Sequence, residues 1–333
     1  MPQGRLAHVL RALSERKDGR LLVGPDTFDD AGVVVLGREE GLPAGTSLHL
    51  VQTVDFFPPV VDDPYLYGAI AAANALSDVY AMGGRPISAL TLASFPKDFP
   101  EDWLAAVLQG GFDKVHESGA AVVGGHTVEG AVQFGFACTG VVEREHLTAN
   151  TGARAGDRLY LTKPLGMGTY STAAKKSAIE WSEMEGAARQ MATLNAAAAE
   201  AMVAAGAQAA TDVTGFGLIG HAHNLARASG VTLAFDAARV PFFGRALELS
   251  AAGHNSGGAK RGRAHLGDAV ELAASLDEAL VRLLFDAETS GGLLIAIAPD
   301  AAATLERELA LRDVPVCRVG EVEDRGEHSI RVR

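Results

Sequence analysis

Four aspartates stand in short segments of small and apolar residues that lie far apart in the chain. These segments are Thr27-Phe28-Asp29-Asp30-Ala31, Thr53-Val54-Asp55-Phe56-Phe57, Asn74-Ala75-Leu76-Ser77-Asp78-Val79 and Thr211-Asp212-Val213-Thr214-Gly215-Phe216-Gly217. None of them contains Lys or Arg, and a buried carboxylate without a partner is costly to desolvate. Mg²⁺ takes oxygen ligands and usually shares them with substrate phosphates. The four segments therefore predict a metal–nucleotide site.

Each aspartate also has an ordinary structural interpretation when it is considered alone. Asp29 and Asp30 could cap a turn, and Asp212 could be the N-cap of the helix that follows it. For Asp55, at the end of a predicted strand, the local sequence does not decide between a structural role and a role in a site. Asp78 differs, because the predicted helix around it is apolar on nearly every side, where a charge is rare. Considered together, the four favour a shared site.

Three further features could lie near such a site. Gly124-Gly125-His126-Thr127 follows a predicted strand, and glycines let backbone N–H groups approach phosphate oxygens, although a plain turn with a structural histidine fits equally well. Lys163 could reach a phosphate as a point charge, although an exposed, solvated lysine is more usual. The small-residue run 289–292 predicts a tight turn. Common nucleotide-binding loops such as Gly-x4-Gly-Lys-Ser/Thr are absent from the sequence, so a nucleotide would be held in another way.

Composition limits the classes of function. The chain has 333 residues, of which 48% are hydrophobic and 21% charged, so a sizeable core is available. A net charge of −12 argues against a nucleic-acid binder, which needs a basic excess. Cys138 and Cys317 lie in strand-like apolar stretches and are expected to be buried thiols. No signal-peptide pattern precedes Arg20 and no apolar run is as long as a membrane span, so we expect a cytoplasmic protein.

The apolar periodicity predicts interspersed strands and helices. Strands are predicted at residues 21–23, 32–36, 47–54, 87–93, 120–123, 134–142, 158–162 and 292–298. Helices are predicted at residues 6–15, 65–82, 101–118, 185–205, 268–284 and 299–312, and residues 212–220 are predicted to be a loop that enters another helix. This pattern indicates two α/β or α+β halves. The polar, glycine-containing segment 152–157 divides them into domains 1–155 and 156–333.

Seven ordered blocks of the sequence resemble the selenophosphate synthetase (selenide, water dikinase) family. They are residues 21–31, 53–62, 70–84, 124–127, 161–166, 211–217 and 289–292. The resemblance spans nearly the whole chain, from about Leu21 to Glu321. It implies the two-domain fold of aminoimidazole ribonucleotide synthetase, in which an N-terminal ATP-binding α/β domain dimerises through its sheets and is followed by a C-terminal α+β domain.

The resemblance also implies a reaction and a set of site residues. Selenide, ATP and water would give selenophosphate, AMP and phosphate, for selenocysteine and selenouridine biosynthesis. Asp30, Asp78 and Asp212 resemble the ligands of several Mg²⁺ ions. Thr27, Phe28, Asp29 and Asp55 resemble nucleotide contacts, as does Asp78 in its second role, while Gly125, His126 and Thr127 would contact the nucleotide from the facing subunit of a homodimer. A selenium-delivery protein is a candidate partner; nucleic acid and membrane are not.

The chain departs from the family pattern at its start. Members carry Cys or selenocysteine followed by Gly-Cys-Lys before the first helix, whereas this sequence opens Met1-Pro2-Gln3-Gly4-Arg5-Leu6, and neither cysteine replaces the reactive one. No catalytic nucleophile is therefore assigned. The chain could be trimmed, a start could be assigned downstream of a selenocysteine codon, or the protein could be a natural variant. Gly262, where the family often has Asn, is a smaller departure.

Two alternatives to a selenophosphate synthetase remain. The first is a catalytically deficient, nucleotide-binding regulatory paralogue, motivated by the missing reactive residues. The second is another ATP-dependent member of the superfamily, such as thiamine-phosphate kinase or the hydrogenase-maturation dehydratase. The blocks around Asp55 and Asp212 disfavour the second alternative.

Overall fold

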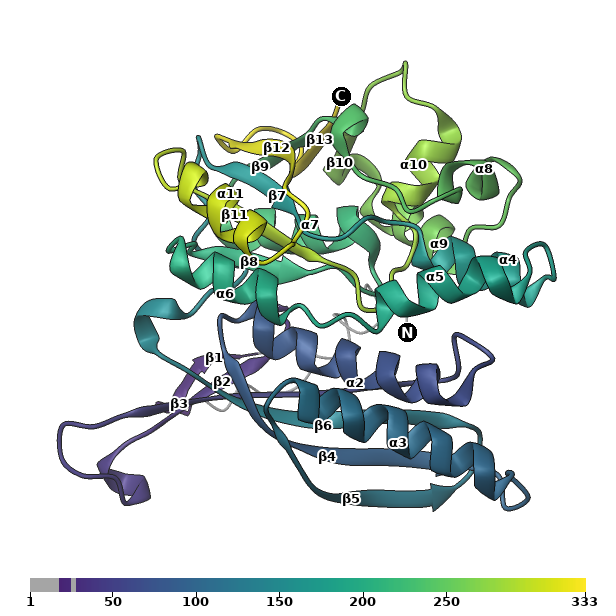
Figure 1. Cartoon of the computed structure of the whole chain (residues 1–333). Coiled ribbons are helices and arrows are strands. Elements are labelled where there is room, and N and C mark those ends of the chain that lie inside the picture. Colours follow the sequence, from purple (N-terminus) through teal and green to yellow (C-terminus); the bar gives the residue numbers. More distant parts are fainter. Residues whose placement is uncertain (1–17, 25–27) are drawn as a thin grey trace.

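The computed structural model describes residues 18–24 and 28–333 and arranges them around two sheets, one below the other in Figure 1. The strand order of the first sheet is β1-β2-β3-β6-β4-β5. Its strands are β1 (Leu21–Val23), β2 (Gly32–Leu36), β3 (Leu48–Phe57), β4 (Arg85–Phe95), β5 (Ala121–Glu129) and β6 (Gln133–Val142). Neighbours are antiparallel except β4 and β5, which are parallel. The predicted helix 6–15 lies outside the described residues.

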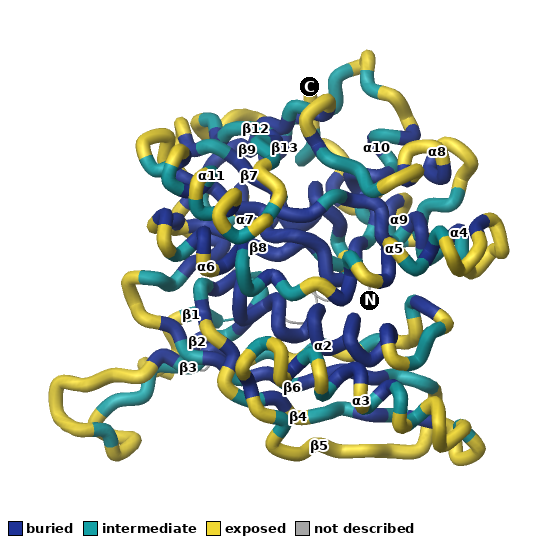
Figure 2. Tube along the Cα trace, viewed as in Figure 1, coloured by how far each residue is buried: buried dark blue, intermediate teal, exposed yellow. Residues whose placement is uncertain are grey.

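Two helices, α2 (Pro64–Ala81) and α3 (Glu101–Glu117), cover one face of this sheet (Figure 1). The Asp63 carboxylate caps α2 by accepting a hydrogen bond from the Leu66 backbone N–H at 2.8 Å, and Pro64 occupies the first helical turn. From Leu66 onward α2 is buried, because its other side packs against helices and a strand of the second half (Figure 2). The predicted buried helix that carries Asp78 near its end is confirmed.

The strand order of the second sheet is β10-β13-β9-β12-β7-β11-β8. Its strands are β7 (Arg158–Leu161), β8 (Ala209–Asp212), β9 (Thr232–Phe235), β10 (Val270–Leu272), β11 (Leu293–Ile297), β12 (Cys317–Glu323) and β13 (Ile330–Val332). The helices of this half are α4 (Met167–Lys175), α5 (Trp181–Met191), α6 (Ala196–Ala204), α7 (Gly217–Ser229), α8 (Ala246–Ala251), α9 (Gly257–Leu266), α10 (Glu278–Leu284) and α11 (Ala302–Leu311). One apolar core runs from the first sheet through α2 into α5, α6 and β11.

Two predicted helices of the second half are wrong in extent. The single helix predicted at 185–205 is divided into α5 and α6, and the break at residues 192–195 turns the Thr193 carbonyl and the Asn195 side chain toward other elements. The helix predicted at 268–284 is confined to α10, because residues 270–272 pair in parallel with β13 instead. In both places tertiary contacts override the local propensity.

The glycine-rich segment 124–127 is not a turn after a strand, as the sequence predicts, but lies inside β5. Gly125 has φ +157°, and a Cβ there would meet the Thr91 Oγ1 at 1.8 Å and the Thr91 carbonyl oxygen at 2.4 Å. The residue is therefore glycine because β4 runs too close for any side chain. β5 is the outer strand of the sheet and is exposed along most of its length (Figure 2).

Candidate metal–nucleotide site

The structure brings together the four aspartates that the sequence singles out. Asp30 precedes β2, Asp55 lies in β3, Asp78 is in the last turns of α2 and Asp212 ends β8. The charges of Asp55, Asp212 and Asp30 all act on Asp78, and Asp212 acts on both Asp30 and Asp55. The cluster therefore joins carboxylates from both halves of the chain at the place where α2 meets β8.

Three of these carboxylates accept a hydrogen bond from a neutral side chain. Thr53 Oγ1 donates to Asp78 Oδ2, Asn74 Nδ2 to Asp55 Oδ2 at 2.6 Å, and Thr211 Oγ1 to Asp30 Oδ1 at 2.8 Å. The Ser77 side chain hydrogen bonds to the Asp212 carboxyl group, but Asp212 Oδ2 is buried without a hydrogen-bond partner among the described residues. Within that part of the chain, no lysine, arginine or histidine forms an ion pair with any of the four.

Burial favours the protonated form of every member, and repulsion by neighbouring carboxylates adds to this at Asp30, Asp55 and Asp78. Desolvation, followed by the charge of Asp212, raises the pKa of Asp55 to about 7. Desolvation raises the pKa of Asp212 to about 6 and the pKa values of Asp30 and Asp78 well above their ordinary range. Four carboxylates held this close are stable as anions only with cations between them. Hard divalent cations fit the oxygen donors and the unpartnered Asp212 Oδ2.

His221, one turn into α7, lies beside the cluster and is not among the residues predicted from the sequence. One atom each of Asp30, Asp212 and His221 lie within 4.8 Å of one another, which makes the imidazole a geometric candidate for a metal ligand. Its Nε2 accepts from the Thr214 backbone N–H at 3.1 Å, and its Nδ1 lies 3.4 Å from Thr211 Oγ1.

These contacts use both ring nitrogens of His221. Thr211 Oγ1 already donates to Asp30, so Nδ1 carries the proton that points to Thr211. Burial lowers the pKa of His221 to about 4, which keeps the ring neutral. In this structure His221 therefore orients Thr211, and through it Asp30. The signal available in the sequence was a histidine one turn into the helix that follows the Asp212 segment.

The interpretation of Asp212 as a helix cap is wrong. α7 begins five residues later at Gly217, and its N-cap residue, Phe216, makes no side-chain cap. The loop interpretation of Asp29 and Asp30 is compatible with the cluster, since both precede β2 in irregular backbone. Asp29 Oδ1 accepts from the Asn150 backbone N–H at 2.5 Å, and the Phe28 carbonyl from Asn150 Nδ2 at 2.8 Å. Thr27 lies outside the described residues.

Comparison with known proteins identifies the family. A family model described as AIR synthase related protein, N-terminal domain, matches residues 28–142, and its C-terminal counterpart matches residues 154–333. Selenide, water dikinase of Geobacter metallireducens is 46% identical over 320 residues, which cover 96% of this chain and 91% of that protein. The protein of the same name from Nitratidesulfovibrio vulgaris is 43% identical over 336 residues, covering 97% and 92%. The chain belongs to the selenide, water dikinase family.

Solved structures confirm the aminoimidazole ribonucleotide synthetase-like fold. Thiamine-monophosphate kinase from Stenotrophomonas maltophilia K279a superposes with a TM-score of 0.68 at 22% identity, covering 98% of this chain and 93% of that one. Hydrogenase maturation protein HypE in complex with ATP gives 0.63 at 18% identity, covering 96% and 82%. Sequence identities of 22% and 18% establish only a shared fold, whereas the selenide, water dikinase relatives are 46% and 43% identical to this chain.

Gly125, His126 and Thr127 do not join the carboxylates within one chain. β6 and β4 separate β5 from β3, which carries Asp55, and three strand spacings amount to about 14 Å. β5 is an exposed edge strand, and all three residues are exposed to solvent.

The two cysteines are poor nucleophiles in this structure. Cys138 lies opposite Thr53 in the β3–β6 pair and is buried. Burial, followed by the charges of Asp78 and Asp55, raises the pKa of the Cys138 thiol to about 12. Burial also raises the pKa of Cys317, which is only partly buried. Neither forms a thiolate readily at neutral pH.

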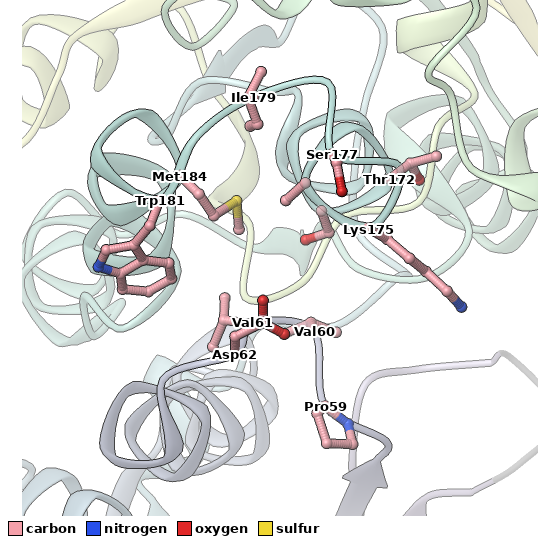
Figure 3. Close-up of a pocket in the computed structure, with 12 residues that line it drawn as sticks. Pro59, Val60, Val61, Asp62, Thr172, Lys175, Ser177, Ile179, Trp181 and Met184 are labelled. Carbon is pink, nitrogen blue, oxygen red and sulfur yellow. The ribbon is translucent and has the colours of Figure 1, made fainter.

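A separate cavity of about 530 Å³ lies where the β3–α2 connection faces α4 and α5 (Figure 3). Trp181, Met184 and Val61 form apolar walls, and the Asp62 carboxylate and the Ser177 hydroxyl supply polar atoms. None of the four clustered aspartates is among the residues that line it. The cavity lies at the N-terminal end of α2, whereas Asp78 is near the opposite end of that helix.

Among the helices of residues 18–24 and 28–333, none combines the length and apolar character that crossing a membrane requires.

Proposed function

We propose that this chain makes selenophosphate from selenide, ATP and water, with AMP and phosphate as the other products. The observation that carries the proposal is the convergence of four buried carboxylates that form no ion pair with another described residue, in a chain 46% identical to a selenide, water dikinase over nearly its full length. Phosphoryl transfer depends mainly on positioning and on neutralising charge. An acidic cluster that requires cations is suited to a triphosphate held through metals.

Asp30, Asp78 and Asp212 are proposed to hold several Mg²⁺ ions, and Asp55 with Thr27, Phe28 and Asp29 to contact the nucleotide. When bound, Mg²⁺ would neutralise charge on the phosphate oxygens during transfer. The chain's own part is geometric: Thr53 orients Asp78, Asn74 orients Asp55, and Thr211 with His221 orients Asp30. Selenide is already anionic near neutrality, so it can accept the γ-phosphoryl group without a general base.

The site is proposed to be completed in a homodimer formed through the first sheet. α2 and α3 cover only one face of that sheet, and large apolar side chains are exposed on the rest of it. The exposed fractions are 53% for Val54, 52% for Phe56, 46% for Leu90, 62% for Val123 and 49% for Val128. An apolar patch of this kind on a sheet marks an interaction surface. A second copy docked there would bring its Gly125, His126 and Thr127 toward the nucleotide.

Three further assignments are part of the same proposal. The chain is divided into domains 1–155 and 156–333, a boundary that falls in the connection between β6 and β7. The protein acts in the cytoplasm. A selenium-delivery protein is its candidate partner, because free selenide is reactive and a closed site would protect it until the transfer has occurred.

Asp78→Ala is the direct test of the metal–nucleotide site. We expect the variant to lose Mg²⁺-dependent binding of a non-hydrolysable ATP analogue in calorimetry, because it removes the carboxylate that interacts with the other three. Its circular dichroism and thermal unfolding without ligand should stay close to those of the wild type, since a repulsive charge has been removed. ATP-analogue affinity equal to that of the wild type, in a folded variant, would refute the site.

A further inference from the structure

One buried lysine connects the two loops that hold α2 against the second half of the molecule. Lys163 lies two residues after the end of β7, and its side chain is buried, with 5% of the residue exposed. Its Nζ donates to the Thr193 carbonyl at 2.7 Å and to the Ser290 carbonyl at 2.9 Å. The expectation of a solvated lysine is therefore wrong, and the ammonium group points to backbone oxygens.

Each of these loops makes a hydrogen bond to α2. Beside Thr193, Asn195 Nδ2 donates to Ser77 Oγ at 2.8 Å and to the Gly291 carbonyl at 2.8 Å. From the other loop, the Ser290 backbone N–H donates to Asn74 Oδ1 at 2.8 Å. The two loops and the lysine thus form one buried network, which we call the loop clamp: Lys163, Thr193, Asn195, Ser290 and Gly291.

The loop clamp holds α2 directly beside the carboxylates. Ser77 precedes Asp78 in the chain, and Asn74, one turn earlier, donates to Asp55. Asp212 is on the same side of the boundary as the clamp, at the end of β8, which pairs with β11 just beyond Gly291. The loop clamp therefore lies between α2, which carries Asp78, and the strand pair that carries Asp212.

An ammonium group suits this role for a chemical reason. It has three donors and no acceptor, so it can hold two carbonyl oxygens of separate loops at once. Ser290 also needs holding, because its φ of +49° is a left-handed conformation that a serine adopts only when its surroundings impose it. The positive charge of Lys163 acts favourably on Asp212. An apolar side chain of similar length would supply neither the donors nor the charge.

We propose that Lys163 is a positioning residue, which fixes the loop clamp and thereby sets the distance between Asp78 and Asp212 that cation binding requires. It does not touch the phosphates. The inference rests on the proposed metal–nucleotide site, because its effect is exerted on the carboxylates of that site.

Lys163→Met tests the inference, since methionine has a similar unbranched shape and no donor. In the full chain, we expect the Mg²⁺ concentration for half-maximal binding of a non-hydrolysable ATP analogue to rise at least tenfold. Excess Mg²⁺ should restore binding, because the carboxylates remain and only their spacing is loosened. Lys176→Met, at an exposed lysine of the same half, is the matched control and should behave as the wild type.

Asn195→Ala gives a second measurement that a merely structural role would not change. If both residues act through the clamp, the double variant should need no more Mg²⁺ than the worse single variant, whereas independent effects would multiply. Lys163→Met with wild-type Mg²⁺ dependence would overturn the inference, and so would a loss that excess Mg²⁺ cannot restore in a folded protein. If Asp78→Ala also binds normally, the proposed site itself has failed; if only Lys163→Met does, the inference alone has failed.

Discussion

A carboxyl group buried among other carboxylates binds its proton more tightly than one in water, and Asp55 shows the consequence at the residue scale. Its ordinary pKa is near 4, and burial with the charge of Asp212 raises it to about 7. Between these pH values the folded chain binds a proton at Asp55 that the unfolded chain has lost. Without metal, this residue's contribution to folding stability therefore falls as pH rises from about 4 to about 7.

Asp55→Asn should reverse that loss. Asparagine keeps the shape and can still accept from Asn74, but it has no proton to lose. In the presence of a chelator, the variant and the wild type should unfold at similar temperatures near pH 4. The variant should become the more stable by about 4 kcal/mol near pH 8.

Comparing the two proteins at each pH cancels the opposite contribution of His221, whose pKa is lowered to about 4. Thermal unfolding at a series of pH values gives the difference curve. A curve that is flat between pH 4 and pH 8 would mean that Asp55 is not held in a desolvated, repulsive site. Added Mg²⁺ should stabilise the wild type more than the variant.

At the scale of elements, the glycine-rich segment shows how one sequence pattern supports two structures. Gly124 and Gly125 predict a turn that could approach phosphate, but both belong to β5, where Gly125 lies against the Thr91 backbone of β4. Gly124 also has a positive φ, +142°, yet a Cβ there would meet only Leu90 Cδ2 at 3.7 Å. A substitution at Gly124 therefore tests backbone strain alone, whereas a substitution at Gly125 tests strain together with the lack of space for a side chain.

Gly125→Ala should destabilise the protein more than Gly124→Ala. Gly124→Ala places alanine in an unfavourable backbone conformation, which costs about 1 kcal/mol. Gly125→Ala adds a clash with the Thr91 carbonyl oxygen, which cannot rotate away, and this clash costs about 1–3 kcal/mol more. Denaturant unfolding of the two variants measures the difference. Equal destabilisation would contradict the close approach of β5 to β4.

Elements with strong local patterns could be predicted from the sequence, and those decided by distant partners could not. α2 is an example of the first kind, because its apolar residues and the glycines after it define a buried helix that carries Asp78. The break between α5 and α6 is of the second kind. Its alanine-rich flanks favour one helix, and the break is associated with Lys163 and Ser77, which contact Thr193 and Asn195 from other elements.

The site divides in the same way. Asp30, Asp55, Asp78 and Asp212 could be predicted as a group, because each is a carboxylate in an apolar segment without a cation. His221 could not, since its importance lies in two hydrogen bonds that only the folded loop after β8 creates. The burial of Lys163 was equally hidden, because Thr193 and Ser290 are 30 and 127 residues away in the sequence.

At the scale of the whole molecule, one chain holds the carboxylates but keeps His126 on a distant edge strand. The exposed side chains of Val54 and Phe56 lie on the strand that carries Asp55, so the same β3 serves the cluster on one face and the proposed dimer contact on the other. If a second copy covers that face, each site is composite. A composite site predicts that two variants with defects in different residues can complement each other, which a site within a single chain does not.

Two inactive variants should complement each other in a hybrid dimer. Asp78→Asn removes a residue of the cluster and His126→Ala removes the residue proposed to come from the facing copy, so each homodimer should bind the ATP analogue weakly or not at all. In a hybrid, one site carries both changes and the other carries neither. Equal co-expression with random pairing should therefore restore about a quarter of the wild-type sites, and hybrids purified by two different tags should have one site per dimer.

Calorimetric stoichiometry measures this outcome, and ultracentrifugation confirms that the hybrids are dimers. If His126 served the carboxylates of its own chain, both sites of the hybrid would be defective and no binding would return. If the His126→Ala homodimer bound normally, the histidine would have no part in the site. Restored binding requires instead that the exposed β5 edge of one copy reaches the carboxylates of the other.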